Sequence, residues 1–104
     1  MNKDAATMMI RKIAKCEDKV FFTRHAKERD PDQGKYPLTK DQILNCLCLG
    51  SVVDNPEQDG KIAGGWKCVM RRFVARECHE IVLVFVPETQ VLVITAYPFF
   101  NAIR

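Results

Sequence analysis

The chain has 104 residues, of which 47% are hydrophobic and 28% charged, and its formal net charge is +3. This length is typical of one domain, and the composition is that of a folded globular protein and excludes disorder. No apolar run approaches the ~18 residues of a membrane helix, and the N-terminus lacks the apolar stretch of a secretory signal. We therefore expect a single cytoplasmic domain over residues 1–104 that makes no membrane contact.

The cysteine pattern bears on metal and redox chemistry. An odd number of cysteines in a chain without an export signal indicates reduced thiols. No Cys-x-x-Cys pair and no cluster with histidine is present, so the spacing does not favour a zinc site. We expect no metal and no cofactor, and most of the thiols should pack as small hydrophobic groups. The cysteines are Cys16, Cys46, Cys48, Cys68 and Cys78.

A first helix is predicted from residue 4 to about residue 16, because apolar residues recur there at helical spacing. This stripe should pack on the core. It consists of Met9, Ile10, Ile13 and Ala14. The apolar residues 20–22 that follow form a short hydrophobic anchor.

A second helix should begin after Thr23, whose hydroxyl is a good N-cap. His25 precedes Arg29 by four residues, a spacing that places both on one helical face. The positive end of the helix disfavours an imidazolium, so we expect a neutral ring able to act as a general base at pH 7. Pro31 should end this helix near Asp30. The structural alternative is a capped surface helix whose histidine is only packed or solvated.

Thr39 and Gln42 form a capping box, which predicts a third helix ending at Gly50 as a left-handed stop. From residue 51 the pattern changes to strands, expected at 51–54, 66–75, 81–86 and 91–97. The uninterrupted apolar run 81–86 favours a central strand covered on both faces. His79 should lie in the preceding turn, exposed to solvent.

Short turns join neighbouring strands in antiparallel fashion. The prediction is therefore an α+β fold, with N-terminal helices packed on one face of a four-stranded antiparallel sheet. Within it, residues 60–76 carry five basic residues and no acid. Such a cluster either attracts phosphates or is an ordinary solvated strand face. The five are Lys61, Lys67, Arg71, Arg72 and Arg76.

Three segments of the chain resemble the small bacterial DUF4258 domain family. They are Thr-Arg-His-Ala-Lys-Glu-Arg at 23–29, the capped helix of 38–50 followed by Ser-Val-Val, and Val-Ile-Thr-Ala-Tyr at 93–97. Together they lie within about residues 20–98. The chain departs from the family at 30–34, where Asp-Pro-Asp-Gln-Gly replaces a second arginine followed by glycine. The family is similar to RelE-type and related compact ribonuclease folds, so the resemblance implies a toxin-like endoribonuclease that needs no metal.

Metal-independent cleavage of RNA requires a base for the ribose 2′-hydroxyl, a cation for the phosphate and an acid for the leaving oxygen. We assign His25 the base or acid role, and Arg29 or Arg72 the phosphate. Thr95 and Tyr97 should alternate onto one face of the last strand. Their hydroxyls would orient the phosphate there, and Tyr97 would stack a base or donate a proton.

Two other functions fit the same sequence. A non-catalytic interaction module would dock a protein partner or a second copy through its sheet, because Leu83 and Phe85 need cover on the face away from the helices. The apolar tail at 98–100, expected to be exposed, points the same way. A nucleic-acid binder without cleavage would use the basic cluster and need no histidine.

Overall fold

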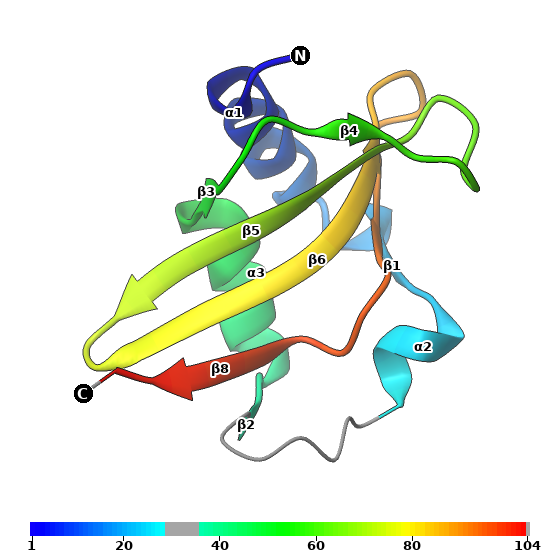
Figure 1. The fold of residues 1–104 in the computed structure, drawn as a ribbon. Helices are drawn as coiled ribbons and strands as arrows, with labels where there is room; N and C mark the ends of the chain where they lie inside the picture. The colour runs from blue at the N-terminus through cyan, green and yellow to red at the C-terminus, as the bar shows by residue number, and fades with distance from the viewer. Residues whose placement is uncertain (29–35, 104) are drawn as a thin grey trace.

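The computed structural model describes residues 1–28 and 36–103. Helices α1 (Lys3–Ala14) and α3 (Lys40–Leu49) lie behind a twisted sheet in the view of Figure 1, both on one side of it. The fold is therefore α+β, and the predicted fold class is confirmed. No helix in the described part of the chain is long and apolar enough to cross a membrane.

Within the described residues, the sheet is larger than predicted and is mixed. Eight strands form it: β1 (Val20–Phe22), β2 (Tyr36–Pro37), β3 (Ser51–Val52), β4 (Glu57–Gln58), β5 (Trp66–Val74), β6 (Glu77–Val86), β7 (Val91–Ile94) and β8 (Phe99–Ala102). The main order is β1-β7-β6-β5-β3, and β1 runs parallel to β7. The prediction of four antiparallel strands is corrected: the meander β5-β6-β7 is antiparallel, but short strands from distant parts of the chain extend it. Strands of two to four residues are too short to show a period in the sequence.

Strand β6 is the centre of the sheet. One of its edges pairs with β5 over residues 77–85, after a two-residue turn in which Ala75 has a φ of 53°. The other edge is shared, because residues 83–86 pair with β7 and residues 77–80 pair with β8. The predicted exposed tail at 98–100 is wrong for this reason, since Phe99 and Phe100 belong to β8.

The core lies between the two helices and the sheet. Alternate residues of the central strands point toward the helices and are buried there. They are Cys68 and Met70 of β5, Ile81, Leu83 and Phe85 of β6, and Leu92 and Ile94 of β7, packed with Ile10 and Leu47. We call the opposite side of the sheet, which faces the viewer in Figure 1, the open face. On that face Val84 and Val86 are buried beside Gly65 and Gly64, whereas Val82 is only partly covered.

The ends of the helices follow local capping chemistry. Helix α1 ends at Ala14, two residues earlier than predicted, and a short 3₁₀ helix (Glu17–Lys19) follows it. Helix α2 (Arg24–Lys27) begins at the predicted cap, where the Thr23 hydroxyl accepts a hydrogen bond from the Ala26 amide. It ends before Asp30 because Glu28 already has extended backbone angles. The capping box of α3 is confirmed.

Gly50 ends α3, but not in the predicted left-handed conformation. Its φ is −78° and its ψ is −174°, which is extended backbone. Glycine is required here by close approach, because a Cβ would lie 2.5 Å from the Cys46 carbonyl oxygen and 2.8 Å from that of Arg71. Arg11 of α1 also donates hydrogen bonds of 2.7 and 3.0 Å to the Gly50 carbonyl oxygen. The end of α3 is thus held tightly between α1 and β5.

Replacing Gly50 by alanine should destabilise the protein, because the added methyl group meets backbone atoms that cannot move aside. We expect a loss of about 1–3 kcal/mol in the free energy of unfolding, as for other overpacked sites. Gly60→Ala is the matched control, since a Cβ at Gly60 meets nothing within 4 Å. Urea titrations of the two variants should differ clearly, and equal midpoints would contradict this account of the helix end.

Cysteine reactivity tests the position of the core. Burial raises the pKa of Cys46 and of Cys68 to about 12, so both thiols are protonated and shielded at pH 8. Iodoacetamide at pH 8 should modify the exposed Cys16 first, and Cys46 and Cys68 only after unfolding in denaturant. Peptide mass spectrometry at several time points measures this order. Alkylation of Cys46 and Cys16 at similar rates in the folded protein would show that the core is misplaced.

Candidate functional site

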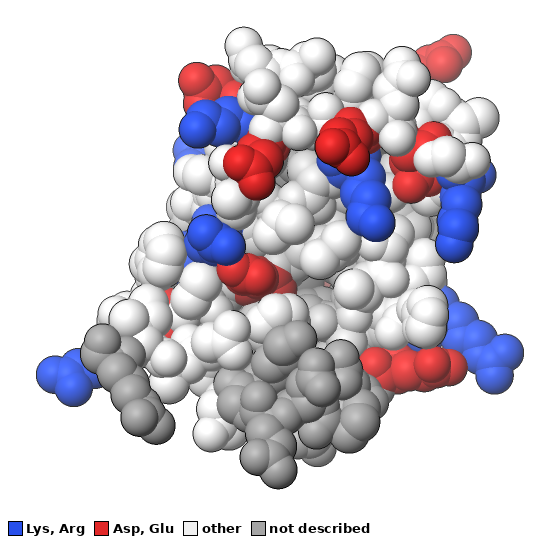
Figure 2. All heavy atoms as spheres, viewed as in Figure 1, with Lys and Arg blue, Asp and Glu red and all other residues white. Residues whose placement is uncertain are grey.

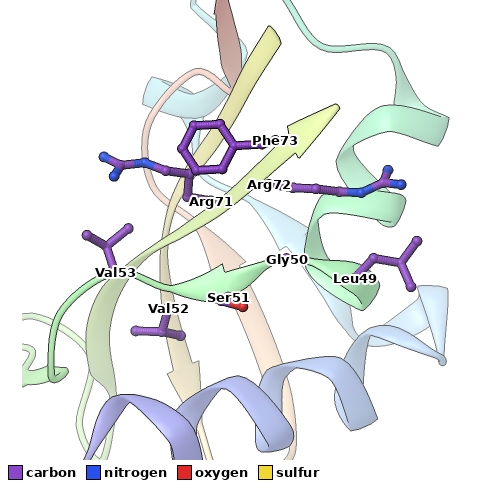
Figure 3. Close-up of a pocket in the computed structure, with 8 residues that line it drawn as sticks. All are labelled: Leu49, Gly50, Ser51, Val52, Val53, Arg71, Arg72 and Phe73. Atoms are coloured by element: carbon purple, nitrogen blue, oxygen red, sulfur yellow. The ribbon is translucent and has the colours of Figure 1, made fainter. Parts of the chain in front are cut away.

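Two adjacent arginines of β5 lie on opposite faces of the sheet. The register places Arg71 opposite Glu80 and Arg72 opposite His79 on β6. Met70, two residues before Arg72, is fully buried beneath the helices, so Arg72 lies on the helix-facing side and Arg71 on the open face. Figure 3 shows the two guanidinium groups pointing to opposite sides of the strand.

Arg71 and Glu80 form an ion pair on the open face. The Arg71 Nε donates to Glu80 Oε1 at 2.7 Å, and Nη2 lies 2.6 Å from the same oxygen. The hydrogen bond to Glu80 raises the pKa of Arg71. The Cys78 thiol also donates to Glu80 Oε1, at 3.9 Å. All three contacts use one carboxylate oxygen and only part of the guanidinium, whose remaining donors stay available to a ligand.

Thr95 shares this face. Its amide donates to the Val82 carbonyl oxygen at 3.1 Å and thereby continues the pairing of β7 by one residue, and its hydroxyl lies 3.5 Å from the same oxygen. Because Ile94 is buried on the helix side, alternation places Thr95 on the open face. Glu80 is then a diagonal cross-strand neighbour of Thr95, a relation that corresponds to about 7–8 Å. Thr95 therefore groups with Arg71 and Glu80, and the structure does not bring it together with Arg72.

Tyr97 lies in the connection between β7 and β8, where it is partly exposed. The prediction of a strand to residue 97 is wrong, because β7 ends at Ile94. The reason lies in β6, whose edge pairs with β7 at residues 83–86 and with β8 at residues 77–80. The chain must leave that edge after Thr95 and return at Phe99, so Thr95 and Tyr97 do not alternate on one strand.

His25 lies at the surface, at the end of β7. The Thr23 amide donates to the Ile94 carbonyl oxygen at 3.0 Å, so α2 begins beside the residue that precedes Thr95. Figure 1 shows α2 next to the connection from β7 to β8. The His25 side chain is 86% exposed, and its Nδ1 is 3.7 Å from a Glu28 carboxylate oxygen. Arg29, the other candidate on this helix, lies outside the described residues.

The five basic residues of 61–76 do not form one patch. Arg71 and Lys67 alternate onto the open face, and Arg72 onto the opposite face. Arg71 is paired with Glu80, and Lys67 lies opposite Glu57 of β4. Figure 2 shows the open face with charged groups of both signs dispersed over it. The described residues of this face therefore do not form a uniformly basic strand surface for phosphates.

His79 is the residue that sequence reasoning misplaced most. It lies on β6 and not in a turn, and only 2% of it is exposed. Its Nε2 is 2.8 Å from Glu77 Oε1, and its ring packs on Phe100 at 5.6 Å between centroids. Nδ1 is buried and has no hydrogen-bond partner among residues 1–28 and 36–103. The sequence predicts the hairpin turn at the wrong residues because Ala75 adopts the positive φ of the turn, and no glycine or asparagine at that position indicates it.

A hollow of about 530 Å³ lies beside the end of α3, away from His25 and Thr95. Figure 3 shows its walls, which come from the end of α3, from β3 and from β5. The lining residues are Leu49, Gly50, Ser51, Val52, Val53, Arg71, Arg72 and Phe73. Arg72 thus lines this cavity together with Arg71, whereas His25, Thr95 and Tyr97 do not line it. In the described part of the chain, no three histidine, cysteine or acidic side chains are grouped so as to hold a metal ion.

The two histidines should differ sharply in their contribution to stability. His79→Ala leaves a cavity and a Glu77 carboxylate without its partner, so we expect a loss of about 2–4 kcal/mol in the free energy of unfolding. His25→Ala is the matched control and should change it by less than about 0.5 kcal/mol, as other exposed substitutions do. Urea unfolding of both variants measures the difference, and similar losses would contradict the placement of His79 in the core.

The comparisons with known proteins find no relative. No family model matches the chain, and neither does any curated protein or solved structure. The function must therefore be argued from the geometry of the open face.

Proposed function

We propose that the chain is a metal-independent endoribonuclease of the toxin-like kind suggested by its resemblance to the DUF4258 family. The observation that carries the proposal is the grouping of Arg71, Glu80 and Thr95 on the open face. Helix α2, which carries His25, begins beside Ile94, the residue that precedes Thr95. These are the residue types that cleavage through the 2′-hydroxyl requires. In this proposal the phosphate is bound by Arg71, and not by its neighbour Arg72 as expected from the sequence.

Arg71 is suited to bind the scissile phosphate. A guanidinium has five donors in a planar fork, and Glu80 engages Nε and Nη2. The remaining donors would contact phosphate oxygens while Glu80 keeps the side chain in place. As negative charge grows on the phosphorus oxygens, a positioned donor of this kind contributes roughly 3 kcal/mol to transition-state stabilisation.

The proton transfers are assigned to His25 and Glu80. One of them takes the proton of the 2′-hydroxyl, whose oxygen then attacks phosphorus, and the bond to the 5′-oxygen breaks. The other donates a proton to that leaving oxygen. The products are a 2′,3′-cyclic phosphate and a 5′-hydroxyl. The Thr95 hydroxyl would orient the phosphate, and Tyr97, which is exposed in the adjacent connection, would stack a base.

A non-catalytic module that docks a protein on the same face is the second candidate. Phe21 and Phe73 favour it, because both alternate onto the open face and more than half of each is exposed. The two rings lie apart, since the register puts Phe21 level with Lys67 and Phe73 at the other end of β5, so a docked partner would contact each of them separately. This function requires neither His25 nor Glu80, so an assay of RNA cleavage distinguishes the two candidate functions.

RNA cleavage by neighbouring arginine variants tests the proposal. End-labelled single-stranded RNA incubated with the wild type in EDTA should be cut to products with 2′,3′-cyclic phosphate ends. Arg71→Gln and His25→Ala should each lower the rate by about 100-fold or more. Arg72→Gln removes the same charge one residue away on the other face, and should change the rate less than about threefold.

An all-deoxy strand of the same sequence should remain intact, because it has no 2′-hydroxyl. Absence of cutting by the wild type, or equal losses in Arg71→Gln and Arg72→Gln, would overturn the proposal. Binding without cutting, with a steep dependence on salt concentration, would instead identify a nucleic-acid binder.

A further inference from the structure

The outer edge of β5 is only partly paired. Strand β4 pairs with Trp66 and Lys67, and β3 pairs with Met70 and Arg71. Beyond Arg71, no strand of the described residues lies on that edge. The last residues of β5 therefore present an open sheet edge next to the end of β3.

The backbone of Phe73 points outward at this edge. The Val53 amide donates to the Val69 carbonyl oxygen, and the Arg71 carbonyl oxygen faces Gly50, so residues 69 and 71 direct their polar groups to the outer side. In an antiparallel strand every second residue does the same, which adds the N–H and C=O of Phe73. By contrast α1 caps the neighbouring β3, where the Val52 amide donates to the Thr7 hydroxyl at 2.9 Å. The edge of β3 is thus closed by the Thr7 side chain, whereas the edge of β5 beyond Arg71 is open.

The hollow beside α3 adjoins this open edge and carries positive charge. Arg71 and Arg72 line it from opposite faces of β5, as Figure 3 shows, and none of its lining residues is acidic. Arg71 is already paired with Glu80, whereas no carboxylate pairs with Arg72 within the described ranges. Phe73, which is 66% exposed, stands between them on the open-face side.

We propose that this edge binds an extended acidic segment of a partner protein, which adds to the sheet as a further strand beside β5. The backbone of the segment pairs with the N–H and C=O of Phe73. Because side chains alternate along the added strand, acidic residues on the helix-facing side meet Arg72, and apolar residues on the open-face side cover Phe73. The free cation and the exposed aromatic ring thus specify a segment of alternating acidic and apolar residues. This site does not depend on RNA cleavage at the open face.

A peptide of this pattern tests the site directly. The probe is a fluorescein-labelled, end-capped octapeptide of alternating glutamate and valine, and its binding to the full chain is followed by fluorescence anisotropy. It should bind the wild type and lose affinity about tenfold or more with Arg72→Gln, because a charge-assisted contact is removed. Lys67→Gln removes a charge from the same strand under β4, and should leave affinity within about twofold.

Backbone pairing is tested separately. Phe73→Pro removes the outward amide and should abolish binding. Proline is tolerated at outward positions of edge strands, and if this variant does not fold, a probe N-methylated on one edge tests the same hydrogen bonds with the wild-type protein. Equal binding of an alternating lysine and valine peptide, or no effect of N-methylation, would overturn the proposal. Dimerisation of the wild-type chain that the probe competes away and Phe73→Pro abolishes would also overturn it, since a second copy would then occupy the edge.

Discussion

Nine consecutive residue pairs join β5 to β6, from Trp66 opposite Phe85 to Val74 opposite Glu77. This register decides which side chains meet, because a slip of one residue moves every side chain to the other face of the sheet. Burial of Met70, Ile81 and Leu83 against α3 and α1 fixes the register, since the alternative would expose them. The hydrophobic core thus determines that Arg71, and not Arg72, lies with Glu80 on the open face.

The shared edge of β6 has a second consequence. Strands β7 and β8 occupy different halves of that edge, so the chain must leave it between Thr95 and Phe99. This break places Thr95 at the end of a strand and Tyr97 in an irregular segment beside α2. Functional residues are often carried by such connections on a rigid scaffold. The proposed site therefore depends on a discontinuity in the sheet that is imposed by β8.

Local chemistry made part of this structure predictable. The caps at Thr23 and Thr39, the helix of residues 3–14 and the apolar strands of the meander follow from side-chain types at fixed spacing. The pairings of β1 and β8 did not, because they are long-range and involve only three or four residues each. Gly50 was assigned to the correct place for the wrong reason, since its role is set by the approach of β5 and not by its own backbone angles.

The candidate site was harder to predict for the same reason. Motifs suggest His25 and Thr95 as candidates, but the choice between two adjacent arginines depends on strand parity, and the mixed pattern of β5 leaves the parity open. Glu80 was not singled out because it begins to matter only when the register places it opposite Arg71. The sequence predicts a solvated turn at His79 because Ala75, where the hairpin turns, carries no turn signal.

The central claim is that the core-determined register makes the open face the RNA-binding surface. Amide chemical shifts of the ¹⁵N-labelled protein, titrated with a 2′-O-methyl RNA that cannot be cleaved, test it most directly. The account predicts saturable changes at Arg71, Glu80, Thr95 and His25, with little change at Arg72 and His79. Changes centred on Arg72 and the hollow beside α3, or no changes at millimolar RNA, would contradict it.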